Sequence, residues 1–158
     1  MAYRGLKLEE PATADFEQVL QLEAHTHQDW RGRGLALYEL KRYEEAIVSF
    51  DKALEISPDY YYAWIFRGFP LDNLGEYEEA IASYDKALEI SPDEYDAWIF
   101  RGYALYKLWK YEEAIASYDK AIEINLDEYD AWINRGWALF NLKRYEETFQ
   151  NWEDGREH

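Results

Sequence analysis

The residue types best suited to metal chemistry lie together near the start of the chain. His25, His27 and Asp29 offer nitrogen and oxygen ligands within one short segment. Zinc requires three or four converging ligands that further hydrogen bonds hold in place. A connecting segment with this spacing does not provide them. The chain also contains no cysteine, so we predict neither a metal site nor a disulfide.

Paired glutamates recur along the chain and are the next candidates for chemistry. They occupy positions 44–45, 78–79, 112–113 and 146–147. Identical copies in four places do not build one acid–base site, and acids at the start of a helix complement its dipole. No Ser/His/Asp set or glycine-rich phosphate loop stands out either. We therefore expect no enzymatic activity and no cofactor.

The charge balance excludes several classes of partner. The formal net charge is −16, whereas nucleic acids and anionic membranes attract proteins through Lys and Arg. No segment approaches the roughly 18 apolar residues of a membrane span, and the N-terminus lacks the apolar run of a signal peptide. We expect no nucleic-acid partner, no direct membrane insertion and a cytoplasmic location, whether or not the chain is part of a longer protein.

A repeat must position whatever functional residues the chain has. The segment Ala63–Gly68 returns 34 residues later as Ala97–Gly102, and again with one change as Ala131–Gly136. A period of this length indicates stacked units that cannot bury their apolar faces alone. Each unit carries two apolar stripes at helical spacing. In the second unit these are Trp64, Gly68, Leu71 and Leu74, then Tyr77, Ala80, Ile81, Tyr84, Ala87 and Leu88.

These residues resemble the tetratricopeptide repeat (TPR) family, in bacterial, cyanobacterial-like form. Its pattern falls on Trp98, Gly102, Leu105, Ala114, Tyr118 and Ala121, and on Trp30, Gly34, Leu37, Ala46, Phe50, Ala53 and Pro58. Leu126 replaces the final Pro of the third unit, and Thr148 replaces an Ala in the fourth. The resemblance implies an all-α, right-handed α-solenoid of antiparallel helix pairs. We expect a degenerate half-repeat over 1–26, repeats over 27–60, 61–94 and 95–128, and an incomplete repeat over 129–158.

In this family the first helices of successive repeats line a concave groove. The side of these helices opposite the packing stripe should be polar if it met only water, yet it is apolar. We therefore expect a protein–protein interaction scaffold that binds a partner helix, or second an extended peptide, in an aromatic groove. The alternative is that these side chains pack between neighbouring first helices. The predicted groove residues are Tyr62, Ile65, Phe66, Phe69, Ile99, Phe100, Tyr103, Tyr106, Ile133, Trp137 and Phe140.

Charged residues around the groove bear on the kind of partner. Acids at the rim favour an apolar partner with basic flanks; they are Glu39, Asp72, Asp96 and Asp130. A subset of the family grips a terminal carboxylate with Lys, Asn and Arg. At the matching positions only Arg31 could serve here, so that function is rejected.

Arginines recur where the family usually places an apolar residue, at positions 33, 67, 101 and 135. A partly buried Arg needs an acidic partner, and Asp51, Asp85 and Asp119 are equally periodic. We interpret Arg33, Arg67, Arg101 and Arg135 as a structural ladder. The alternative, a cationic track for an acidic ligand, is disfavoured by the surrounding negative charge.

The last predicted helix has two aromatic residues that nothing in the repeat pattern covers, Phe149 and Trp152. Solenoids normally end on polar capping helices. This favours, as an alternative function, a self-assembling array in which copies associate through exposed ends or swapped helices. Trp109, in place of glycine at an inter-helix turn, is expected to be exposed.

Overall fold

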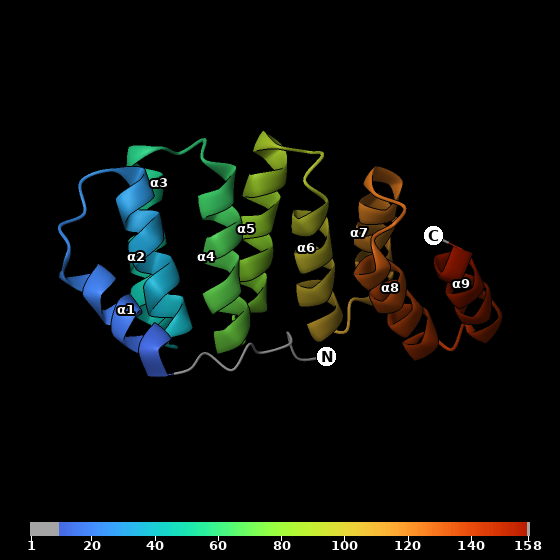
Figure 1. Cartoon of the computed structure of the whole chain (residues 1–158). Helices are drawn as coiled ribbons and strands as arrows, with labels where there is room; N and C mark the ends of the chain where they lie inside the picture. Colours follow the sequence, from blue (N-terminus) through green and yellow to red (C-terminus); the bar gives the residue numbers. More distant parts are fainter. Residues whose placement is uncertain (1–9, 158) are drawn as a thin grey trace. The chain divides into compact units, whose positions relative to one another are not determined.

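The computed structural model describes residues 10–157, with side chains from residue 13 to residue 156. These residues form nine helices and no strand (Figure 1), so the all-α prediction is confirmed. Residues 1–9 of the predicted N-terminal half-repeat lie outside the described residues. The helices are α1 (Glu10–Gln21), α2 (His27–Glu39), α3 (Tyr43–Ile56), α4 (Tyr61–Leu74), α5 (Tyr77–Ile90), α6 (Tyr95–Lys107), α7 (Tyr111–Ile124), α8 (Tyr129–Asn141) and α9 (Tyr145–Glu157).

The helices belong to two compact units. Unit 1 ends at Leu74 and holds α1–α4, and unit 2 begins at Gly75 and holds α5–α9. Within each unit, helices that follow one another in the chain pack side by side. The predicted repeat 61–94 therefore contributes α4 to unit 1 and α5 to unit 2.

Glycines on the first helices allow close packing against an aromatic ring of the next helix. A Cβ atom on Gly102 would lie 2.6 Å from Cε1 of Tyr118, and one on Gly34 would lie 2.7 Å from Cε1 of Phe50. Tyr118 and Phe50 are almost completely buried. The Gly and aromatic positions of the repeat are thus two halves of one contact, in α6–α7 and again in α2–α3.

Tryptophan side chains fasten three first helices to the turns that precede them. The indole Nε1 of Trp64, Trp98 and Trp132 donates to a backbone carbonyl six residues earlier, each time at 2.9 Å. The acceptors belong to Pro58, Pro92 and Leu126. Because a carbonyl is the acceptor, Leu126 serves as well as a proline, which explains why this departure from the family pattern is tolerated.

The turn between the two helices of a repeat requires a left-handed backbone conformation. The residue there has φ of 60° at Lys41, 81° at Gly75, 64° at Trp109 and 60° at Lys143. Only glycine adopts this region without a steric cost. Trp109 is 78% exposed, as expected, and its ring lies 6.3 Å from that of Tyr111 between centroids.

Candidate functional site

The outward side of α6 and α8 presents three large aromatic side chains in unit 2. Tyr103, Trp137 and Phe140 are 40%, 45% and 46% exposed. Their helices are held from the other side, because Ala97, Leu105, Ala131 and Leu139 are at most 1% exposed. We call Tyr103, Tyr106, Trp137 and Phe140 the unit 2 face. Tyr106, like Phe100 and Ile133, is half-buried, whereas Ile99 is buried.

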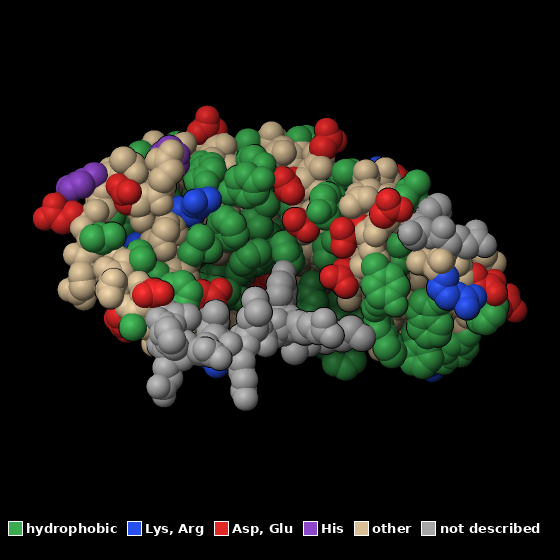
Figure 2. Space-filling model, viewed as in Figure 1, with side chains coloured by type: hydrophobic (Ala, Val, Ile, Leu, Met, Phe, Trp, Pro, Cys, Tyr) green, Lys and Arg blue, Asp and Glu red, His purple; other side chains and the backbone are tan. Residues whose placement is uncertain are grey.

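The outward side of α4 carries the corresponding residues of unit 1. Tyr62 is 41% exposed, Phe66 and Phe69 are half-buried, and Ile65 is only 4% exposed. We call Tyr62, Phe66 and Phe69 the unit 1 face. In Figure 2, hydrophobic side chains gather over α4. Ile65 and Ile99 are almost completely buried, so neither side chain is offered to a partner.

Rings of the unit 1 face support one another in a continuous series. Centroids of Tyr62 and Phe66 lie 6.3 Å apart, and those of Phe66 and Phe69 lie 5.7 Å apart. The series continues to Tyr38 of α2, 6.1 Å from Phe69, and begins at Tyr60, 6.1 Å from Tyr62. Aromatic pairs at such separations are favourable. The contacts therefore restrict the rings before any partner binds.

The unit 2 face is joined to the last helix by ring contacts. Trp137 lies 6.1 Å from Phe140 and 6.3 Å from Trp152 of α9, between centroids. Phe140 lies 5.5 Å from Tyr145, at the start of α9. The exposed aromatic surface of unit 2 therefore extends from α8 onto α9.

Two asparagines that the sequence interpretation did not use hold tyrosines that belong to these faces or contact them. Asn141 Nδ2 donates to the Tyr106 hydroxyl at 3.0 Å and to the Trp137 carbonyl at 2.8 Å. Asn73 makes the same two bonds in unit 1, to the Tyr38 hydroxyl at 3.2 Å and the Phe69 carbonyl at 2.8 Å. Burial raises the pKa of Tyr38 despite that bond. Asparagines at equivalent positions two repeats apart were the signal that could have revealed this role.

Carboxylates gather beside the unit 2 face, where α6 and α8 begin. Asp96 and Asp130 lie in the first turns of these helices, and Glu128 is the N-cap of α8. Burial raises the pKa of Asp96. Burial, followed by repulsion from Asp130 and Asp96, raises the pKa of Glu128. Figure 2 shows acidic side chains among hydrophobic ones over α6 and α8. The sequence interpretation included Asp96 and Asp130 but missed Glu128, which precedes the helical stripe.

Lys107 lies at the opposite end of α6 from these acids. Its Nζ atom is 5.9 Å from the ring centroid of Tyr103, within the range of a cation–π contact. The outward side of unit 2 is therefore acidic where α6 and α8 begin, aromatic in the middle and basic where α6 ends.

The histidine segment has a structural role in this fold. Asp29 Oδ2 accepts from the backbone N–H of Thr26 at 2.8 Å and of His25 at 3.1 Å, which completes the cap of α2. These backbone donors lower the pKa of Asp29. The His27 ring packs against Tyr60, 5.0 Å between centroids. Within residues 10–157, no group of His, Asp and Glu could hold a metal ion.

The repeated arginines pair with repeated aspartates on the preceding helix. Nε of Arg67 donates to Asp51 at 2.6 Å, and Nε of Arg101 donates to Asp85 at 2.6 Å. The equivalent bond from Arg135 to Asp119 is 2.5 Å long. Arg33 differs, because its Nη1 donates to the backbone carbonyl of Leu20 at 3.2 Å. Three rungs are thus ion pairs and the first is a bond to the backbone of α1.

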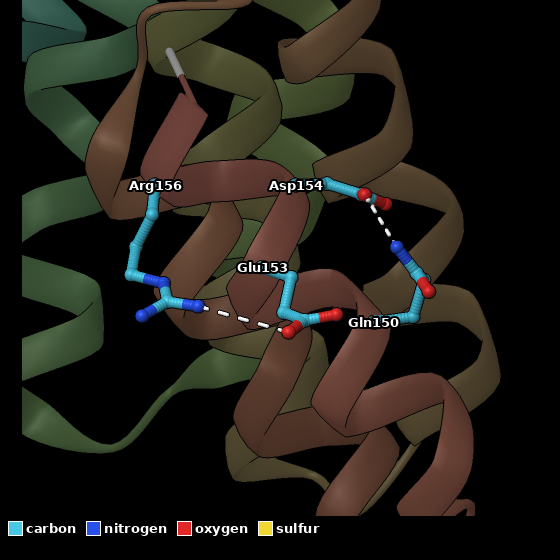
Figure 3. A pocket seen from close by; sticks show the side chains of 4 residues that line it. All are labelled: Gln150, Glu153, Asp154 and Arg156. Atoms are coloured by element: carbon cyan, nitrogen blue, oxygen red, sulfur yellow. Dashed lines mark hydrogen bonds and ion pairs between the residues drawn. The ribbon is translucent and has the colours of Figure 1, made fainter.

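Two shallow hollows add no further candidate site. One lies on α9 and is lined by Gln150, Glu153, Asp154 and Arg156 (Figure 3). Its side chains satisfy each other, since Gln150 donates to Asp154 at 2.7 Å and Arg156 lies 3.8 Å from Glu153. The other, in unit 1, is lined by Trp30, Arg33, Leu37, Glu44, Glu45, Val48 and Ser49.

Arg31 is the one residue that could have contributed to carboxylate binding. Its guanidinium carbon lies 5.9 Å from the ring centroid of Tyr60. Its buried Nε atom has no hydrogen-bond partner among the described residues. Arg31 is therefore packed against an aromatic ring at one end of the unit 1 face.

Solved structures with a similar fold cover almost the whole chain. MamA from Desulfovibrio magneticus RS-1 superposes with a TM-score of 0.81 at 20% identity, over 94% of this chain and 84% of that one. Another crystal structure of MamA gives a TM-score of 0.82 at 19% identity, over 92% and 85%. The first TPR of Spaghetti (RPAP3), bound to the HSP90 peptide SRMEEVD, gives 0.73 at 20% identity, over 77% and 97%. These likenesses support the TPR-type α-solenoid fold.

Sequence comparisons bear directly on the family. No curated protein matches this sequence. In the described part of the chain, no helix is long and apolar enough to cross a membrane. Models of the tetratricopeptide repeat match residues 28–60, 71–126 and 110–148, which together exceed half of the chain. This chain belongs to the tetratricopeptide repeat family.

Proposed function

We propose that this protein is an interaction module in which the outward aromatic side chains of the first helices bind a peptide or helix of a partner protein. One observation carries the proposal: Tyr103, Trp137 and Phe140 are each at least 40% exposed on helices whose opposite side is already buried. Tyr and Trp are the commonest energetic anchors of protein interfaces. Clustered aromatic side chains that remain this exposed mark a contact surface.

Contacts that hold the side chains of each face in place favour binding without a large rearrangement of those side chains. Asn141 ties the Tyr106 hydroxyl to the helix that carries Trp137, and the ring of Trp137 rests against Phe140 and Trp152. A surface that is rigid before binding loses less conformational entropy on binding. The same logic applies in unit 1, where Asn73 contacts Tyr38 and the carbonyl of Phe69.

The comparisons support the class of function but do not identify the partner. A TPR of similar fold is bound to a peptide. At that level of identity the likeness concerns the fold, and a fold hosts many functions. The proposal is therefore one of peptide binding in general, with no enzymatic step, because the face offers aromatic contact and no assembled catalytic group.

A peptide-library selection on the immobilised full chain tests this proposal. The dissociation constant of the best peptide is then measured by fluorescence anisotropy for the wild type, Trp137→Ala and Trp109→Ala. Trp109 is the matched control, because it is even more exposed but lies in the turn after α6 and is a member of neither face. We expect Trp137→Ala to weaken binding about 30-fold, as for an anchor of about 2 kcal/mol.

The control variant should bind within about twofold of the wild type, as near-neutral sites do. Tyr103→Ala provides a second variant that leaves the contacts of Trp137 intact. The proposal is wrong if no peptide is enriched, or if Trp137→Ala and Tyr103→Ala both bind like the wild type.

Self-assembly is a second candidate function, favoured by one observation on α9. Phe149 and Trp152 are 62% and 43% exposed, whereas their equivalents one repeat earlier, Ile115 and Tyr118, are 7% and 1% exposed. Side chains that the repeat normally covers are thus uncovered on α9. A second copy could cover them through a contact between ends.

Light scattering on a size-exclusion column, across a wide concentration range, separates the two candidates. A mass that stays at 19.0 kDa leaves both faces available and counts against self-assembly. A larger mass that survives dilution, and that Phe149→Gln or Trp152→Gln abolishes while Trp109→Gln does not, would support it.

A further inference from the structure

We propose that the unit 2 face takes a basic partner segment, whose Lys or Arg side chains lie against Asp96, Glu128 and Asp130 while its apolar side chains contact Tyr103, Trp137 and Phe140. This inference rests on the proposed peptide-binding function and adds the charge and the placement of the ligand. It concerns unit 2 alone.

The acidic and aromatic parts of this surface belong to the same two helices. Asp96 precedes Tyr103 by two helical turns on α6, and Asp130 precedes Trp137 by the same interval on α8. Seven residues of helix span about 10 Å. Since α6 and α8 are in contact, their acidic ends form one patch, and their aromatic middles form another about 10 Å away.

A role in stabilising the N-termini of α6 and α8 does not by itself explain why these acids are there. An acid at a helix N-terminus is normally stabilised by the helix dipole, which favours its charged form. Burial instead raises the pKa of both Asp96 and Glu128, and the neighbouring acids raise that of Glu128 further. The charged form of each acid is therefore less favoured than in a solvated side chain, and an incoming cation would relieve the repulsion of Glu128 by Asp130 and Asp96.

The described part of the chain supplies no cation for this patch. Its ion pairs between Arg and Asp use Asp51, Asp85 and Asp119, and no described Lys or Arg pairs with Asp96, Glu128 or Asp130. The Asn125 side-chain amide, which is uncharged, donates to Glu128 at 3.4 Å. A partner with Lys or Arg would add the missing opposite charges.

Unit 1 lacks this polarity, which makes the inference specific to unit 2. The repeat positions equivalent to Asp96 and Asp130 hold Gln28 and Tyr62 in unit 1. Arg31 also lies at that end, against the ring of Tyr60. A basic segment would therefore gain no charge pairing at the same place on the unit 1 face.

The experiment uses the full chain and a pair of synthetic fluorescein-labelled helical peptides. Both carry the same Leu and Phe residues at i, i+3, i+4 and i+7, and they differ only in three flanking positions, which are Lys in one peptide and Gln in the other. Affinities are measured for the wild type, for Asp96→Asn/Asp130→Asn, and for Glu112→Gln/Glu113→Gln. The last variant removes two exposed charges from α7 and is the matched control.

The wild type and the control should bind the Lys peptide at least about tenfold more tightly than the Gln peptide. In the Asp96→Asn/Asp130→Asn variant this preference should fall below about threefold, because the peptide lysines lose the carboxylates with which they pair. The preference should shrink from 50 mM to 500 mM salt because ions screen exposed charges. Isosteric Asn replacements remove repulsion, so the melting temperature should not fall.

Two other outcomes separate the inference from the function beneath it. In the first outcome, the Lys and Gln peptides bind equally well and Trp137→Ala abolishes the binding of both. This result overturns the inference that the ligand is basic, but it leaves the proposed peptide-binding function standing. Failure of both peptides to bind, or binding that ignores Trp137→Ala, overturns the inference together with the unit 2 face as its site.

Discussion

The first helices have two sides that differ in how much the repeats vary. On the packing side, α6 and α8 use the same residue types, with Ala97, Gly102 and Leu105 of α6 matched by Ala131, Gly136 and Leu139 of α8. On the outward side, the equivalent residues change from Phe69 to Tyr103 to Trp137. Repeats agree where side chains must fit a neighbour. They differ on the outward side, so the outward side is where function can be specified.

Adding one carbon to the packing side should have the largest effect on stability. Gly34→Ala would place Cβ 2.7 Å from the Phe50 ring, and overpacking of this kind costs about 1–3 kcal/mol. Gly32→Ala is the matched control in the same helix, because nothing lies within 4 Å of its Cβ. There the better helix propensity of alanine should stabilise by about 0.5–1 kcal/mol. Urea denaturation measures both, and equal shifts would contradict the two-sided account.

The Arg–Asp ladder should contribute less than the Gly–aromatic contacts. Arg101 donates to Asp85 at 2.6 Å and to the buried Ser117 hydroxyl at 2.7 Å. Because the Asp85 side chain is 46% exposed, solvent screens the pair. A double-mutant cycle with Arg101→Met and Asp85→Asn should give a coupling energy of about 0.5–1 kcal/mol. A coupling energy near zero would mean that the Arg–Asp pair does not stabilise the fold.

The inter-helix turns offer a stabilising change of similar size that lies on neither side. Lys143 has a φ of 60°, a conformation that glycine reaches at Gly75. Lys143→Gly should raise the free energy of unfolding by about 0.5–1 kcal/mol, since relief of the left-handed conformation exceeds the added chain entropy. Lys143→Ala keeps the side-chain clash and should give no gain, as thermal melts of the two variants would reveal.

The acids beside the unit 2 face should give stability a pH dependence of known sign. Burial raises the pKa of Asp96 above its ordinary value of 3.8, so the folded state holds this proton more tightly than the unfolded state. The cost of ionising Asp96 is absent below about pH 3.8 and is fully present above its folded-state pKa. Asp96→Asn should therefore gain stability relative to the wild type as pH rises through this window. A difference that grows as pH falls would have the wrong sign.

Removing an outward aromatic should change stability least of all. Tyr103 is 40% exposed, and surface substitutions away from special features usually stay within about 0.5 kcal/mol. Tyr103→Ala should therefore melt like the wild type while it loses peptide affinity. A clear loss of stability would mean that Tyr103 belongs to the packing side.

Periodicity was enough to predict the helical repeats, because a 34-residue period and two apolar stripes allow few other folds. It also pointed to the aspartates that pair with Arg67, Arg101 and Arg135. It did not predict that Arg33 would bond to the Leu20 carbonyl, since a backbone acceptor leaves no mark in the residue pattern.

How deeply a side chain is buried was harder to predict than which side of its helix it faces. A helical stripe tells which side of a helix a residue faces, and it placed Ile65 and Ile99 with the outward aromatics. Both are almost completely buried, because neighbouring helices cover positions at the border between the two sides. Glu128 was missed for a related reason: it precedes α8 as its N-cap and so belongs to no stripe.

Hydroxyl-radical footprinting of the full chain, with and without the selected peptide, tests the central claim most directly. It reports the solvent access of each exposed aromatic side chain in one experiment. We expect protection of Tyr103, Trp137 and Phe140, with Trp109 and Phe149 unchanged. Protection confined to Phe149 and other residues of α9, or to the second helices, would contradict the claim that the outward side of the first helices is the binding surface.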